Sequence, residues 1–153
     1  DTLNIIGNSE DPRSRRCSNF SSDSFMLDGE AIASVEGFIQ GIKFRKDHPN
    51  RLIALASAGL KAKRFGKEAE RVFVWWQGQT ILYGTSEHYK LIERAIRAKY
   101  DQNPGAMKAL LDTAGLTLTH DVGHPDPPNT SLPAPVFCDI LTRIREENMA
   151  ARK

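Results

Sequence analysis

Residues 34–44, Ser-Val-Glu-Gly-Phe-Ile-Gln-Gly-Ile-Lys-Phe, constrain the fold of this chain more than any other segment. The i, i+3, i+4, i+7 spacing of a core-facing helix is filled by Val35, Phe38, Ile39 and Ile42. Gly37 and Gly41 lie on another side, so the helix is apolar or small around most of its circumference. We therefore expect a buried helix over residues 33–46, with Ser34 as its N-cap. Because each internal glycine costs about 1 kcal/mol relative to alanine, we expect another helix or a ligand to approach this backbone closely.

The polar side chains inside this segment are Glu36, Gln40 and Lys43. Their i, i+4, i+7 spacing places them on one narrow stripe of the helix. A carboxylate and an ammonium on a buried helix are unfavourable unless they are paired or face a polar cleft. The pattern alone leaves two interpretations open. One is a structural ion pair; the other is a cleft in which a desolvated lysine has a lowered pKa and acts as a nucleophile.

The remaining chain predicts several helices and a few short strands that do not alternate one for one. Strands are expected at residues 3–7, 25–27, 72–76, 80–83 and 116–118, with a turn at Asp28-Gly29. Helices are expected at residues 51–58, 61–71, 86–100, 103–114 and 137–149, and a proline-rich loop at residues 120–133. This order favours an α+β fold over a doubly wound sheet. A length of 153 residues predicts one domain spanning residues 1–153.

Charge and composition exclude several classes of protein. Lys and Arg number 21 against 19 Asp and Glu, a net charge of +2, which excludes a histone-like polycation. No apolar run approaches the length of a membrane-spanning helix, and no secretory signal pattern opens the chain. Two cysteines, Cys17 and Cys138, are too few for a disulfide scaffold or a four-thiolate zinc site. We expect a cytoplasmic protein that acts without a membrane or an obligate protein partner.

Several motifs occur in the order typical of one known family. They are Ser18-Asn19-Phe20, Asp28-Gly29, Ser34-Val35-Glu36 with Gln40, Lys43 and Phe44, residues 95–103 (Ala-Ile-Arg-Ala-Lys-Tyr-Asp-Gln-Asn), residues 110–114, the strand at 116–119 and the helix at 140–145. Together they resemble the signature of the NADAR superfamily, also called YbiA-like. Each motif is short, but their order and spacing cover nearly the whole chain.

The resemblance implies a compact α+β fold and hydrolysis of N-glycosidic bonds in ribosylated substrates, with no cofactor. Members are associated with removing ADP-ribose from guanine in DNA or nucleosides, or with cleaving phosphoribosyl-aminouracil intermediates near riboflavin synthesis. By this resemblance Lys43 is the amine that attacks the anomeric carbon of the ribose through a Schiff base. Glu36 handles protons or stabilises positive charge, and Ser18, Asn19, Phe20 and Gln40 contact the substrate. An oxocarbenium-like transition state and a neutral amine in a low-dielectric site agree with these roles.

The sequence departs from the family pattern at two places. Many members carry a histidine directly after the motif glutamate, where this chain has Gly37. Many also carry a Trp-Gly-x-Gly stretch before the final helix, and residues 120–133 lack that tryptophan. The departures bear on substrate identity more than on reaction type. They also leave open a non-catalytic module that binds ADP-ribose or a nucleotide.

Basic side chains are concentrated in three clusters. These are Arg13, Arg15 and Arg16; five basic against two acidic residues within 61–71; and Lys90, Arg94, Arg97 and Lys99 against Glu93. They are either solvated helix faces or a phosphate-binding rim, in which Arg16 and Lys99 are the candidate contacts. A third hypothesis, a nucleic-acid-binding protein, rests on the same clusters.

The remaining aromatic, histidine and cysteine residues offer few further candidates for binding or catalysis. Trp75 and Trp76 alternate in a strand, so they point to opposite faces, and Trp76 is the better candidate to stack on a base. His120, His124 and Asp126 have no regular ligand spacing, so no metal site is predicted. His48 and His88 are expected at the surface, and a cysteine nucleophile is disfavoured because no partner histidine is placed by the sequence.

Overall fold

The computed structural model describes residues 1–152. Its helices are α1 (Pro12–Cys17), α2 (Val35–Gly41), α3 (Pro49–Leu55), α4 (Gly59–Gly66), α5 (Ser86–Gln102), α6 (Pro104–Leu111) and α7 (Ala134–Ala151). Its strands are β1 (Thr2–Asn4), β2 (Phe25–Leu27), β3 (Glu30–Ile32), β4 (Phe73–Trp76), β5 (Gln79–Leu82) and β6 (Thr117–Thr119). The strands pair two by two: β1 with β6 in parallel, and β2 with β3 and β4 with β5 as antiparallel hairpins. The predicted α+β class is confirmed.

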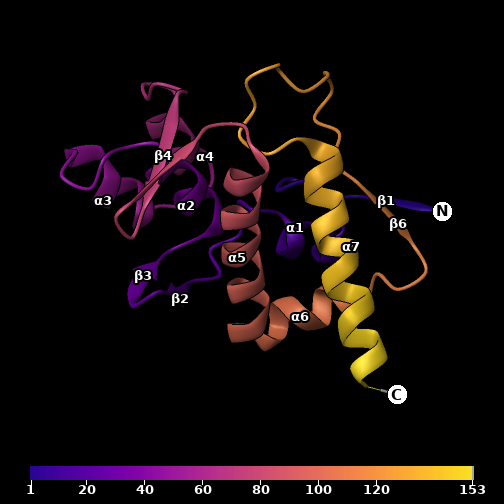
Figure 1. Cartoon of the computed structure of the whole chain (residues 1–153). Coiled ribbons are helices and arrows are strands. Elements are labelled where there is room, and N and C mark those ends of the chain that lie inside the picture. Colours follow the sequence, from indigo (N-terminus) through magenta and orange to yellow (C-terminus); the bar gives the residue numbers. More distant parts are fainter. Residues whose placement is uncertain (153) are drawn as a thin grey trace.

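Helix α5 forms the centre of the molecule, with α2 and the β4–β5 hairpin on one side, α7 on the other and α6 across its end (Figure 1). It is 17 residues long and buries an apolar stripe that includes Leu91, Ile92, Ala95 and Ile96. Both α2 and α7 pack against α5. The core therefore lies around a single long helix, and the small sheets close its periphery. No helix within residues 1–152 is long and apolar enough to cross a membrane.

The buried helix predicted over residues 33–46 is confirmed as α2, and it is shorter than predicted. All seven residues of α2 are buried, and the Ser34 hydroxyl caps the helix by accepting from the Gly37 amide at 2.9 Å. The helix ends at Gly41 because the Ile42 carbonyl accepts from the amide of Trp75 at 2.8 Å instead of continuing the helical ladder. The amides of Lys43 and Phe44 then bond to Gln40 and Gly41 in a tighter turn. Lys43 is thereby held just beyond the helix end.

The two glycines of α2 have the packing role that their positions predict. A Cβ at Gly37 would lie 2.5 Å from the carbonyl oxygen of Ser57 and 2.6 Å from that of Ala54. A Cβ at Gly41 would lie 2.6 Å from the side chain of Leu55. Helix α3 and the residues after it therefore approach the α2 backbone too closely for any side chain. This approach also accounts for the absence of a histidine at position 37.

Gly37→Ala is expected to destabilise the protein by about 1–3 kcal/mol, since the obstructing atoms are backbone oxygens that cannot rotate away. At roughly 2–4 °C per kcal/mol for a chain of this size, thermal unfolding measures the change directly. Gly105→Ala in α6 is the matched control. There the nearest atoms are the end of the Arg16 side chain, which can move. Equal melting temperatures for both variants would contradict the close packing of α2 on α3.

The predicted turn at Asp28-Gly29 is confirmed, and the expected strands near residues 72–76 and 80–83 pair as a second hairpin. Asp28 and Gly29, with φ of 49° and 82°, form the turn between β2 and β3, and Gln77 and Gly78 have φ of 49° and 77° between β4 and β5. Strand β4 alternates between faces as expected, with Trp76 buried and Trp75 partly exposed. The first predicted strand, residues 3–7, pairs with β6 only over Thr2–Asn4.

Candidate active site

The polar stripe of α2 forms a buried cluster at the end of that helix. Glu36, Gln40 and Lys43 are 8%, 5% and 3% exposed. The Lys43 ammonium donates to Gln40 Oε1 at 2.8 Å, and Glu36 Oε2 is buried without a hydrogen-bond partner. Within residues 1–152 Lys43 makes no ion pair with Glu36 and donates to the Gln40 amide instead. Of the two interpretations that the sequence left open, the direct structural ion pair is therefore not formed.

Burial changes the protonation of both charged groups. The pKa of Lys43 is lowered to about 8. Burial makes the largest contribution and the positive charge of Arg71 the next, while the negative charge of Glu36 opposes the shift. Burial raises the pKa of the Glu36 carboxyl, while Lys43, Lys63 and the Gln40 amide oppose that change. The neutral amine is thus a minor form of Lys43 near pH 7, and its fraction is far larger than at the ordinary lysine pKa of 10.5. An ordinary surface lysine lacks this property.

Helix α4 covers the cluster from a second side. A Cβ at Gly66 would lie 1.5 Å from Gln40 Oε1, so a side chain there would displace the Gln40 amide from its place beside Lys43. The Lys63 ammonium on the same helix lies 6.0 Å from the centroid of the Phe20 ring. The interruption at Gly66 that is visible in the sequence therefore marks the wall of the candidate site.

The Ser-Asn-Phe motif lies at the N-terminal end of α2. The Asn19 carbonyl accepts from the Glu36 amide at 3.0 Å, and the Ser18 hydroxyl accepts from the Phe20 amide at 3.1 Å. Ser18 is buried, whereas the side chains of Asn19 and Phe20 are partly exposed. The structure thus brings this motif next to Glu36, and its last residue, Phe20, lies next to Lys63.

Two residues of the cluster were missed by sequence reasoning. His88, which was expected at the surface, is 0% exposed in the first turn of α5, so that prediction was wrong. Its Nε2 atom and the Nε atom of Arg71 are both buried without a partner. A signal for His88 was available, because it begins an i, i+3, i+4, i+7 series with Leu91, Ile92 and Ala95. Arg71, in the segment that leads into β4, carries no comparable periodic signal.

Three of the predicted substrate contacts lie elsewhere. Trp76 packs edge-on against Phe38 in the core, with ring centroids 4.9 Å apart, and its indole N–H donates to Asp28. The buried Lys99 ammonium donates to the carbonyls of Arg16 and Ser18 at 2.8 and 3.0 Å, and burial lowers its pKa to about 8. Lys99 therefore fixes the loop that carries the Ser-Asn-Phe motif.

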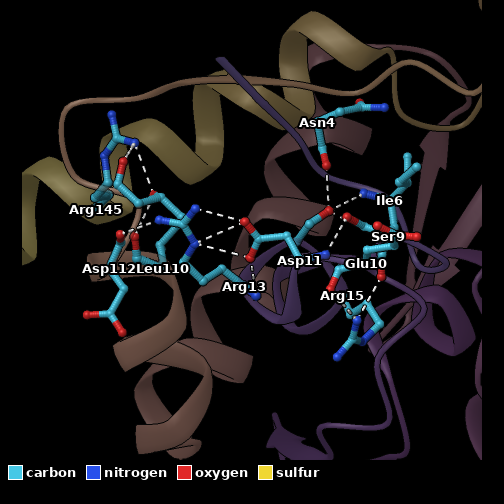
Figure 2. Close-up of polar contacts among 12 residues, drawn as sticks. Asn4, Ile6, Ser9, Glu10, Asp11, Arg13, Arg15, Leu110, Asp112 and Arg145 are labelled. Carbon is cyan, nitrogen blue, oxygen red and sulfur yellow. Dashed lines mark hydrogen bonds and ion pairs between the residues drawn. The ribbon is translucent and has the colours of Figure 1, made fainter. Parts of the chain in front are cut away.

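Arg16 lines a separate open groove of about 620 Å³ beside α1 and α6, together with Arg13, Arg15, Phe20 and Lys108. In this groove Arg16 pairs with Asp23 at 2.7 Å. Arg13 bonds to Asp11 and to the carbonyl of Asp112, and Arg15 bonds to the carbonyls of Ser9 and Glu10 (Figure 2). Much of the positive charge predicted for a phosphate rim is thus already matched by nearby groups. Phe20 joins this groove to the candidate site.

Known proteins resemble this chain in sequence and in fold. The family model described as "Bacteriophage protein GP30.3" matches residues 12–146. An uncharacterised 17.1 kDa protein of the Gp30–rIII intergenic region of Enterobacteria phage T4 is 28% identical over 134 residues, which cover 84% of this chain and 88% of that protein. The NMR structure of the Escherichia coli protein YbiA matches with a TM-score of 0.70 and 21% identity, over 99% of this chain and 88% of YbiA. At that identity the likeness to YbiA shows the fold.

Proposed function

Because the chain belongs to the bacteriophage GP30.3 family, a family of NADAR type, we propose that it hydrolyses the N-glycosidic bond of an ADP-ribosylated base. The observation that carries the proposal is the buried amine of Lys43 beside a carboxylate, Glu36, that has a free oxygen. A buried amine near its own pKa is suited to nucleophilic attack on carbon. A carboxylate oxygen without a partner is free to accept and pass on a proton.

The reaction can be written with these two residues. Neutral Lys43 Nζ attacks C1′ of the ribose, and the C1′–N bond breaks with its electron pair leaving on the base. Glu36 takes a proton from the new C1′–Nζ amine and delivers it to the base. The ribose ring then opens as the remaining Nζ proton moves to O4′, which gives a Schiff base. Water adds to this C1′=Nζ bond and releases the sugar aldehyde and the free lysine.

The surrounding charges favour an anionic substrate. Lys63 and Arg71 both act electrostatically on Lys43, and neither has an ion-pair partner in the part of the chain that the structure describes. Glu36 is the one carboxylate that acts on Lys43. A cluster with this excess of positive charge is stabilised by phosphate groups next to the ribose. An ADP-ribosyl or phosphoribosyl compound supplies them, and an unphosphorylated nucleoside does not.

Incubation with ADP-ribosylated guanosine, with DNA carrying the same adduct and with a phosphoribosyl-aminouracil tests the activity. We expect free guanosine, or unmodified DNA, and a protein–sugar adduct when borohydride is present, both measured by mass. Release from the aminouracil alone would assign the reaction to the other substrate class. Binding of ADP-ribose without release of any base would replace the enzyme by a binding module.

The rate should depend on pH through Lys43. The attacking form is the neutral amine, so kcat/KM is expected to rise with pH and to level off above a midpoint near 8, the lowered pKa of Lys43. Arg71→Gln removes a positive charge that lowers this pKa, so the midpoint should move to higher pH. Initial rates at low substrate concentration across the range give both midpoints. A flat profile, or equal midpoints in the two proteins, would contradict the assignment.

A further inference from the structure

The side chain of His88 has a donor that no group in the protein uses. Its Nδ1 atom accepts from the Gly84 amide at 3.0 Å, so in the neutral ring the proton is on Nε2. That Nε2 atom is buried and has no hydrogen-bond partner within residues 1–152. Buried donors are nearly always satisfied in proteins, and an orphaned one calls for a specific reason. A bound ligand is such a reason.

The ring of His88 is held in one orientation. It packs against Tyr83 at 4.8 Å and Tyr89 at 5.8 Å between ring centroids. The Tyr83 hydroxyl in turn donates to the carbonyl of Asn129 at 2.7 Å and lies 3.1 Å from the Ser131 hydroxyl. Both belong to the loop at residues 120–133, which extends above the start of α5 in Figure 1. The imidazole is therefore fixed at Nδ1 and along its faces, and only Nε2 is left free.

The backbone places His88 on the side of the Lys43 cluster. Helix α5 packs against α2, and the Tyr83 amide donates to the Val72 carbonyl at 2.9 Å, next to Arg71. Burial, and then the charge of Lys43, lower the pKa of His88 to about 4, so the ring is neutral at physiological pH. Next to Lys43, His88 is thus a donor that adds no further positive charge.

We infer that His88 is a substrate-binding residue whose Nε2–H donates a hydrogen bond to an oxygen of the ribosyl group while Lys43 attacks its anomeric carbon. The inference rests on the proposed function, because it places a ribosyl compound beside Lys43. A neutral donor suits this position, since the reacting carbon gains positive charge in the transition state. A protonated histidine there would oppose that charge.

Two substitutions at this position distinguish the role of Nδ1 from the role of Nε2. In His88→Asn the side-chain oxygen takes the place of Nδ1 and still accepts from Gly84, but nothing takes the place of Nε2–H. In His88→Gln the amide nitrogen reaches the place of Nε2 and keeps the donor. Both variants lose the packing of the aromatic ring against Tyr83 and Tyr89, so each serves as the other's control for this loss. Thermal unfolding of both variants measures the stability that it costs.

Calorimetry with ADP-ribose supplies the decisive measurement, alongside guanosine release from ADP-ribosylated guanosine by the unmodified protein. We expect His88→Asn to bind ADP-ribose about tenfold more weakly than His88→Gln. Equal affinity of the two variants, or stronger binding by His88→Asn, would overturn the inference and leave His88 with only its structural contact to Gly84. Absence of ADP-ribose binding by the unmodified protein would overturn it as well. ADP-ribose binding without guanosine release would reject the proposed enzyme and still leave the comparison of the two variants decisive.

Discussion

Lys43→Ala is expected to lower the rate of base release by at least about 10³-fold, because it removes the group that forms the covalent intermediate. The borohydride-trapped adduct should disappear with it. Peptide mapping of the trapped protein should place the sugar on Lys43. Lys99 has a similarly lowered pKa, but its ammonium is held by two backbone carbonyls, so it should remain unmodified.

Controls distinguish loss of the amine from loss of the fold. Lys46→Ala removes an exposed lysine three positions further along and should leave the rate unchanged.

Lys43→Met keeps most of the volume at the site. Since the pKa of Lys43 is lower in the folded than in the unfolded protein, the unfolded chain binds more protons, and the charged lysine destabilises the fold below about pH 8. Lys43→Met should therefore raise the melting temperature below pH 8, and this gain should shrink as the pH rises toward the unfolded pKa. A Lys43→Met protein that is folded and fully active would reject the amine mechanism.

Glu36→Gln is expected to slow base release by about 10²- to 10⁴-fold, the usual range for loss of a group that transfers a proton in the transition state. The glutamine has nearly the same shape, so ADP-ribose affinity should change much less than the rate. Glu68→Gln, an exposed position just after α4, is the matched control. Retention of full activity by Glu36→Gln would remove this residue from the mechanism.

The same substitution should stabilise the protein, and the sign of this effect follows from the direction of the pKa shift. Burial raises the pKa of Glu36 in the folded state, so the folded protein binds the proton more tightly than the unfolded chain. The contribution of Glu36 to stability is therefore complete below its unfolded pKa and is lost as the pH rises through its folded pKa. Glu36→Gln removes this loss, so its melting temperature should exceed that of the unmodified protein more at pH 8 than at pH 5. A gain of stability together with a loss of activity is typical of a residue kept for chemistry.

The two halves of the candidate site differ in how far the sequence reveals them. Glu36, Gln40 and Lys43 lie within eight residues on one helix and its final turn, so helical spacing alone places them together. Arg71 and His88 come from the segment before β4 and from α5, and their meeting with Lys43 depends on how the β4–β5 hairpin and α5 pack onto α2. Local periodicity holds no information on that packing.

For the basic clusters, the sequence alone suggested a function that the contacts in the structure do not support. In the sequence, the arginines near residue 15 and the basic residues at 90–99 suggest a phosphate rim. In the structure, Arg16 pairs with Asp23, Arg97 with Glu93 and Glu147, and the Lys99 ammonium is buried against carbonyls. Asp23 and Glu93 lie close to their partners along the chain, but Glu147 comes from α7, fifty residues away. Net charge over a window of sequence cannot reveal partners that folding supplies.

The sequence by itself determined that a buried helix lies within residues 34–44, that a carboxylate and an amine lie close together on it and its final turn, and that the fold is α+β. These features follow from short-range spacing and from the free-energy cost of placing apolar surface in water. Only the tertiary structure decided that Lys43 donates to Gln40, that α3 excludes a side chain at Gly37, and that Arg71 and His88 interact electrostatically with Lys43. The physical reason is that desolvation and close contact depend on which distant segments cover a residue, and those segments are brought together by packing of the whole chain.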